Sequence, residues 1–125
     1  PVRVQEQEAY LLPHGSPLHA FADEHITGSG LRLLWTAGPT PGSCVVHAPH
    51  ADLLFCGRLL TPLGPGRLGP LRHGRTFHWP RQLESLRRLR GWIPSDARPQ
   101  LASGAGLGAL RGERLVPFSG WSEPV

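Results

Sequence analysis

"LLWTAGPTPGSCVVHAPHADLLFCGRLL", residues 33–60, decides the fold, because it joins three apolar runs through two turns of different kinds. The first turn, "TAGPTPGS", holds two prolines, which fix φ, and two glycines, which permit conformations that a Cβ would block. The second turn, "PHA", separates the apolar runs "CVVHA" and "DLLFCG", a pattern typical of a β-hairpin. The stretch therefore predicts a strand, a rigid turn and a hairpin.

The best helical pattern lies further along the chain. Residues 79–93 carry apolar side chains at helical spacing, with Pro80 in the first turn and Pro94 just past the end. A short strand is expected at Leu101, in the segment that follows this helix.

Other segments give weaker patterns. Residues 2–12 begin with strand-like alternation and then turn helical. Residues 13–30 and 61–78 are rich in glycine and proline. They therefore predict irregular loops, the first with at most one helical turn.

The composition predicts one soluble domain spanning residues 1–125. Its formal net charge is +4, and arginine supplies every basic side chain, which permits an anionic partner. Two cysteines are too few for a disulfide framework. No apolar run reaches the roughly 18 residues of a membrane span, and the first residues lack the apolar core of a secretory signal. We therefore expect a cytoplasmic protein without membrane contact.

Three motifs, in this order, resemble the metallo-β-lactamase superfamily of metal-dependent hydrolases. They are "TAGPTPGS" (36–43), "LLFCGRLL" (53–60) and "LASGAG" (101–106), where the family has T-P-G-H-T-P-G-S, L-F-x-G-D and a strand ending in P-G-H-G. The resemblance implies an α+β fold, the αββα sandwich, with a mainly antiparallel sheet and helices on its outer face. It also implies that the chain is a single domain truncated at the N-terminus, corresponding to roughly the last two-thirds of that fold.

Each motif departs from the family at the position of its metal ligand. The resemblance places the family's histidines on Pro39 and Ala105 and its bridging aspartate on Arg58. Proline and alanine side chains have no lone pair to give, and arginine is a permanent cation that only donates hydrogen bonds. The family's leading H-x-H-x-D-H does not occur in this sequence either. We therefore expect no metal, no cofactor and no catalytic residue, and a vestigial ligand-binding site made of Pro39, Ser43, Arg58, Ser103 and Ala105.

His14, His19 and His25 do not show zinc-binding spacing, whereas His47 and His50 form an H-x-x-H pair, which can bind metal. His47 and His50 flank the hairpin turn, where solvated side chains are expected, and His78 lies in a loop that borders the site in the family. A hairpin centred on His50 would place Cys44 opposite Cys56 on the neighbouring strand. We expect two reduced thiols there, because opposed cysteines on antiparallel strands are poorly placed for an unstrained disulfide.

These observations support three functional hypotheses. The first is an inactive relative of the hydrolases that binds an anionic small molecule or a protein partner, with Arg58 making the vestigial site an anion pocket. The second is a metal-dependent hydrolase whose remaining ligands lie upstream of Pro1. The third is a nucleic-acid-binding module that uses the arginines of the helix. We favour for these arginines a solvated helix face with an i,i+4 pair of Glu84 and Arg88, so nucleic acid is an unlikely partner.

The expected fold also carries a consequence for partners. In the complete sandwich a second sheet covers the face opposite the helices, so this chain would present an apolar sheet surface. We expect an upstream segment or a second copy of the chain to cover it.

Overall fold

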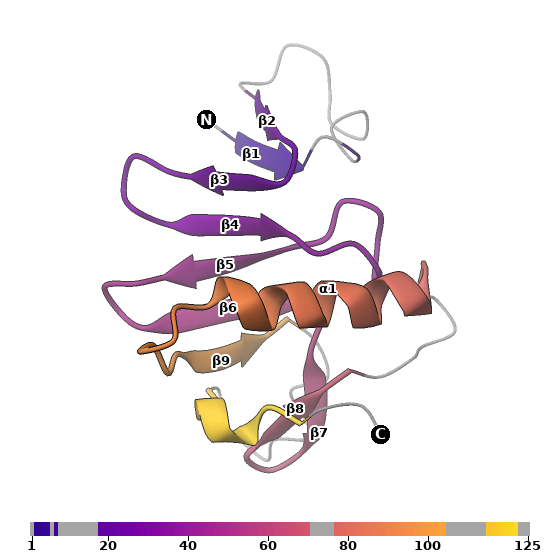
Figure 1. The fold of residues 1–125 in the computed structure, drawn as a ribbon, viewed down its shortest axis with the longest axis vertical. Coiled ribbons are helices and arrows are strands. Elements are labelled where there is room, and N and C mark those ends of the chain that lie inside the picture. The colour runs from indigo at the N-terminus through magenta and orange to yellow at the C-terminus, as the bar shows by residue number, and fades with distance from the viewer. Residues whose placement is uncertain (1, 6, 8–17, 71–76, 105–114, 123–125) are drawn as a thin grey trace.

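A five-stranded sheet forms the centre of the molecule in a computed structural model that describes residues 2–5, 7, 18–70, 77–104 and 115–122 (Figure 1). The strand order is β3-β4-β5-β6-β9, and all neighbours are antiparallel except β6 and β9. The predicted strand, the hairpin and the strand at Leu101 are thereby confirmed. The five strands are β3 (Glu24–Ile26), β4 (Arg32–Trp35), β5 (Cys44–Ala48), β6 (Leu53–Gly57) and β9 (Gln100–Ser103).

Two small sheets flank the central one. Strand β1 (Val2–Gln5) pairs in parallel with β2 (Leu18–Phe21), and β7 (Thr61–Gly64) pairs with β8 (Arg67–Gly69) as a hairpin. The loops predicted for residues 13–30 and 61–78 were therefore partly wrong, since β2, β3, β7 and β8 lie within them. These strands have only three or four residues, too few for alternation to show. Gly66, with φ of 71°, lies in the turn between β7 and β8 instead of interrupting a strand.

Helix α1 (Trp79–Trp92) confirms the helix prediction. It begins at His78, whose ring nitrogen Nδ1 accepts a hydrogen bond from the backbone N–H of Arg81 at 3.1 Å. It ends at Ile93, whose N–H donates to the carbonyl of Leu89 at 3.1 Å, directly before Pro94. A short 3-10 helix, η3 (Phe118–Gly120), follows near the C-terminus. None of the helices that the structure describes is long and apolar enough to cross a membrane.

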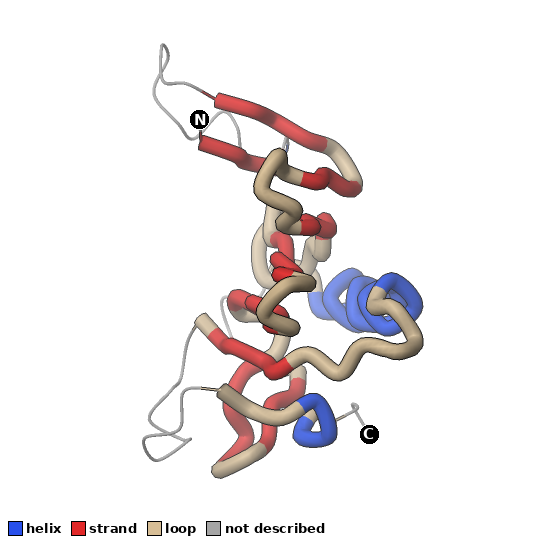
Figure 2. The backbone as a smooth tube through the Cα atoms, turned by 90° about the vertical axis from the view of Figure 1, so that its left-hand side faces the viewer, coloured by secondary structure: helices blue, strands red, loops and turns tan. Residues whose placement is uncertain are grey.

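The core lies between α1 and one face of the central sheet, as Figure 2 shows from the side. Strand register places His47, Leu54 and Leu101 in one cross-strand row on this face. Leu86 and Leu89 of α1 belong to the same buried cluster as Leu54 and Leu101. Alternation along the strands and helical spacing on α1 therefore meet in one core.

The opposite face of the sheet carries a second cross-strand row. Its members are Leu33, Val46, Phe55 and Ala102, and the described helices do not cover them. Phe55 keeps 45% of its surface exposed. An apolar sheet face is thus present, and its cover by an upstream segment or a second copy stays a prediction.

The register of the β5–β6 hairpin differs by one residue from the register expected for the two cysteines. Val46 pairs with Phe55, so continuing the hairpin by one residue places Val45, not Cys44, opposite Cys56. Because successive side chains point to opposite faces, Cys56 is buried with Val45 in the core, while Cys44 lies on the other face. The predicted pairing of the two thiols across the hairpin is therefore wrong.

The β4–β5 loop is held against the first turns of α1. The backbone N–H of His78 donates to the carbonyl of Gly38 at 2.9 Å, and the Ser85 hydroxyl donates to the carbonyl of Ala37 at 2.7 Å. A Cβ on Gly38 would lie 2.4 Å from the Cα of Gln82, and φ of Gly38 is 147°. Only glycine lets the loop approach the helix backbone this closely.

We predict that Gly38→Ala lowers the free energy of unfolding by about 2 kcal/mol or more, because the added methyl overlaps the helix backbone. Chemical denaturation followed by circular dichroism measures the change. The control is Gly91→Ala, because a Cβ there meets nothing within 4 Å and alanine favours the helix. Equal effects of the two substitutions would contradict the role given to Gly38.

A buried polar cluster lies at the other end of the sheet. His47 is 2% exposed, and its Nδ1 lies 3.0 Å from Nη1 of Arg32, which can only donate. The Arg32 guanidinium also lies 4.1 Å from the centre of the Trp92 ring and donates to the Trp92 carbonyl at 3.2 Å. The Trp92 indole N–H in turn donates to the carboxylate of Glu24. Sheet and helix are therefore joined here by a charged stack, and the prediction that His47 is solvated was wrong.

Burial lowers the pKa of His47 below its ordinary value of 6.5, and the positive charge of Arg32 lowers it further. Asp52, whose carboxylate oxygen lies 3.7 Å from Nε2 of His47, has a smaller effect in the opposite direction. The unfolded chain therefore takes up a proton before the folded chain as the pH falls. The stability that neutral His47 contributes is complete above pH 6.5 and declines below it.

We predict that the free energy of unfolding falls between about pH 7.5 and pH 5.5, and that His47→Gln removes part of this fall. Urea denaturation at both pH values measures it. The matched variant is His50→Gln, since His50 is exposed at the tip of the same hairpin. If both variants keep the pH dependence of the parent protein, His47 is not its source.

Candidate functional site

The sequence-predicted site residues gather at one end of the central sheet, on the right in Figure 1. Strands β4, β6 and β9 all end there and β5 begins there, because β5 runs against β4 and β6 while β9 runs with β6. Pro39 and Ser43 lie in the β4–β5 loop, Arg58 follows β6, and Ser103 ends β9. Ala105 lies outside the described residues. The topology therefore brings together four positions from three separate motifs.

The β4–β5 loop takes its shape from hydrogen bonds to its backbone. The carbonyl of Ser43 accepts from the N–H of Thr36 at 2.8 Å and closes the loop at its base. The carbonyl of Pro39 accepts from the N–H of Phe77 at 3.3 Å, just before α1. The Trp35 indole donates to the carbonyl of Pro41 at 2.7 Å. These contacts hold the loop without using a side chain at position 39.

Arg58 and Ser103 lie on neighbouring turns but differ in the contacts of their side chains. Gly57 and Ser103 pair across β6 and β9, and the N–H of Gly104 donates to the carbonyl of Gly57 at 2.8 Å. The Ser103 hydroxyl lies 3.1 Å from the carbonyl of Leu60, to which it donates. Arg58 is exposed, and the described part of the chain gives its guanidinium no ion pair. Ser103 therefore supports the turn, while Arg58 remains open to an anion.

The residues present do not fit the family's pair of metal ions. Pro39 and Arg58 offer no lone pair at the sheet end, and among the described residues no three His, Cys, Asp or Glu side chains lie together. The buried Cys56 lies close by in sequence, but desolvation raises the pKa of its thiol to about 12. A protonated thiol is neither a nucleophile nor a good metal ligand. We derive no metal-assisted step for this site.

The arginines of α1 are largely engaged with the protein itself. Arg88 forms an ion pair with Asp23 at 3.0 Å, so the predicted pair with Glu84 is wrong, and Glu84 lies 3.7 Å from Arg81 instead. Arg90 lies 4.1 Å above the Trp121 ring. Arg88 and Arg90 are thus engaged within the protein, whereas the contact of Arg81 with Glu84 is long and Arg87 is exposed.

Sequence reasoning missed the polar residues that join α1 to the site. Gln82 and Ser85 are buried although they are polar, because they lie on the helix face that meets the loops. The Gln82 amide nitrogen donates to the carbonyl of Leu59 at 3.2 Å, in the turn that carries Arg58. The only sequence signal was their position, since Gln82 lies four residues before Leu86 and Ser85 lies four residues before Leu89.

Comparison with solved structures shows the same fold. The BLEG-1 B3 metallo-beta-lactamase aligns at a TM-score of 0.65 and 20% identity, over 95% of this chain and 60% of that chain. A metallo-beta-lactamase from Pontibacter korlensis aligns at 0.63 and 21% identity, over 90% and 59%. TTHA1623, solved in a di-iron-bound form, aligns at 0.61 and 17% identity, over 95% and 60%. The chain thus spans about three-fifths of the length of these structures.

Sequence comparison gives the family directly. Among curated proteins, none matches this chain. The model of the metallo-beta-lactamase superfamily matches residues 2–116, nearly the whole sequence. The fold, the order of the three motifs and this match agree, and the chain therefore belongs to the metallo-beta-lactamase superfamily.

Proposed function

We propose that this chain binds an anionic ligand at the loop end of its sheet and does not hydrolyse it by metal catalysis. One observation carries the proposal: Pro39 and Arg58 stand at the sheet end where the resemblance implies a histidine and an aspartate ligand. Backbone hydrogen bonds keep the loops in place around them. The scaffold of a hydrolase site is thus present with different chemistry.

The charge at this end favours an anion over a metal ion. Two unit charges 4 Å apart interact by about 1 kcal/mol in water and about 4 kcal/mol at an effective dielectric constant of 20, so the Arg58 guanidinium disfavours a divalent cation beside it. The same guanidinium matches a carboxylate or phosphate group, because its planar N–H groups bond both oxygens at once. Ser43, which is half-buried on the facing loop, adds a hydroxyl.

The solved relatives include metallo-beta-lactamases and a protein solved in a di-iron-bound form. Their metal chemistry does not extend to this chain in our proposal, because two of the donor positions carry side chains without donors. The ligand class we propose is a carboxylate or phosphate compound.

We predict that the purified protein, incubated with excess zinc and then desalted, retains far less than one zinc ion per chain. Elemental mass spectrometry gives the ratio, and a chromogenic β-lactam tests hydrolysis in the same sample. A stoichiometric ion together with zinc-dependent turnover would reject the proposal. The protein is purified without chelator, so that any zinc it binds tightly is not removed before the measurement.

Binding is tested separately with phosphate and citrate as probes. Arg58→Gln should weaken binding by about tenfold, the loss of one charged hydrogen bond. The control is Arg87→Gln, an exposed arginine on α1, which removes the same charge from the surface. Calorimetry at fixed ionic strength measures the affinity of each variant for the probes. An equal loss of affinity in Arg58→Gln and Arg87→Gln would mean that net charge alone attracts the probes.

A further inference from the structure

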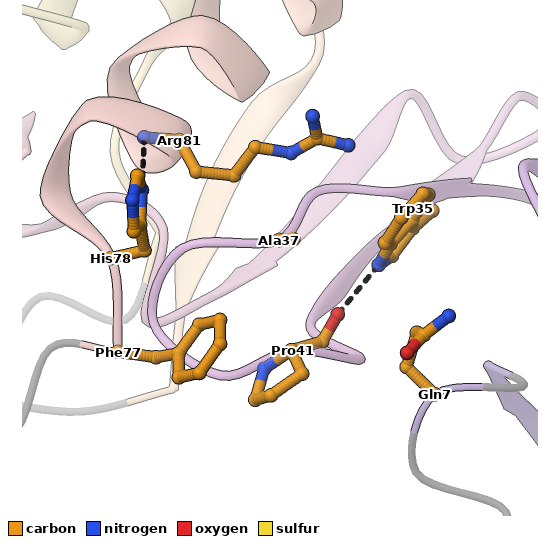
Figure 3. Close-up of a pocket in the computed structure, with 7 residues that line it drawn as sticks. All are labelled: Gln7, Trp35, Ala37, Pro41, Phe77, His78 and Arg81. Carbon is orange, nitrogen blue, oxygen red and sulfur yellow. Dashed lines mark hydrogen bonds between the residues drawn. The ribbon is translucent and has the colours of Figure 1, made fainter.

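A second hollow lies between the β4–β5 loop and the start of α1, with a volume of about 320 Å3. Trp35, Ala37, Pro41 and Phe77 form its apolar wall (Figure 3). Its polar groups come from Gln7, His78 and Arg81. Small-molecule sites have this character, a mainly apolar pocket of about 300–1,000 Å3 with a few polar groups.

The aromatic wall is fixed before any ligand arrives. The Trp35 indole N–H is already bonded to the Pro41 carbonyl at 2.7 Å, so the ring has a set orientation and no unsatisfied donor. Phe77 leaves 59% of its surface in water, although its backbone N–H is bonded to Pro39. A flat apolar molecule placed between these two rings would remove apolar surface from water at little cost in ordering.

Every charged or hydrogen-bonding group of the polar side suits an anion. Arg81 extends from α1 toward Trp35, with its guanidinium carbon 5.0 Å from the ring centre (Figure 3). Its side chain is 42% exposed, and the carboxylate of Glu84 lies at a long 3.7 Å. No acidic residue lines the pocket in the described part of the chain.

His78 adds a donor by virtue of its capping role. Its Nδ1 accepts the backbone N–H of Arg81, so in the neutral ring the hydrogen is on Nε2. The Gln7 amide supplies a further donor. Cation, imidazole and amide therefore border one space beside a fixed aromatic surface.

We propose that this pocket binds small carboxylic acids with a flat aromatic body, the ring lying against Trp35 and Phe77 and the carboxylate on Arg81. The site differs from the Arg58 site, since the described residues that line the pocket do not include Ser43, Arg58 or Ser103. The two proposals can therefore fail independently.

Naphthoate and its neutral analogue naphthamide are the probes, with binding to the full chain followed by calorimetry and ligand-observed NMR. Naphthoate should saturate one site per chain and bind about tenfold more tightly than naphthamide. Arg81→Gln should abolish this difference between the probes. Phe77→Ala should weaken both probes, and the exposed Arg87→Gln should change neither.

Three results would overturn the proposal: no saturable binding, equal binding of acid and amide, or equal losses in Arg81→Gln and Arg87→Gln. If Arg58→Gln abolishes naphthoate binding while Arg81→Gln does not, the acid binds at the Arg58 site. The proposal of an anion site at Arg58 then stands, and the proposal for the Trp35 pocket is rejected. Circular dichroism confirms that each variant is folded. The comparison of acid with amide needs only the parent protein, so it decides the charge requirement even if a variant unfolds.

Discussion

The close approach of the β4–β5 loop to α1 is the constraint on which the rest of the structure depends. Gly38 lies against the backbone of Gln82 with no room for a side chain, and His78 and Ser85 donate hydrogen bonds to the loop carbonyls around it. This contact sets where α1 begins and how it lies across the sheet. The leucines of α1 then meet those of the strands in one buried cluster.

The same constraint gives the glycines and prolines of the β4–β5 loop a structural role that is separate from metal binding. Glycine and proline in "TAGPTPGS" satisfy backbone geometry, and main-chain carbonyls of the loop accept hydrogen bonds from Phe77, His78, Ser85 and the Trp35 indole. The side chain at position 39 takes no part in holding the loop. The shape of this loop therefore places no requirement for a histidine at position 39.

The sequence predicted the elements whose signals are long or sharply bounded. The fourteen-residue α1, with Pro80 and its leucine stripe, and the hairpin around "PHA" are of this kind. The short strands β2, β3, β7 and β8 escaped, because they lie in segments rich in glycine and proline, whose composition favours loops. Cys44 was misplaced because one residue of hairpin register exchanges the two faces. The buried positions of His47, Gln82 and Ser85 depend on contacts from distant segments, which no local pattern records.

Helix α1 is anchored at its two ends by different interactions, and these interactions hold the residues beside it in place. At its start, backbone hydrogen bonds and a glycine contact hold the β4–β5 loop. At its end, the Arg32 guanidinium stacked on Trp92 ties the helix to β4. A helix fixed in this way presents Arg81 beside the indole of Trp35 at a constant separation. Walls that do not have to be ordered on binding lower the entropic cost of capturing a ligand, so the contacts that hold the start of α1 also determine the shape of the pocket beside Trp35.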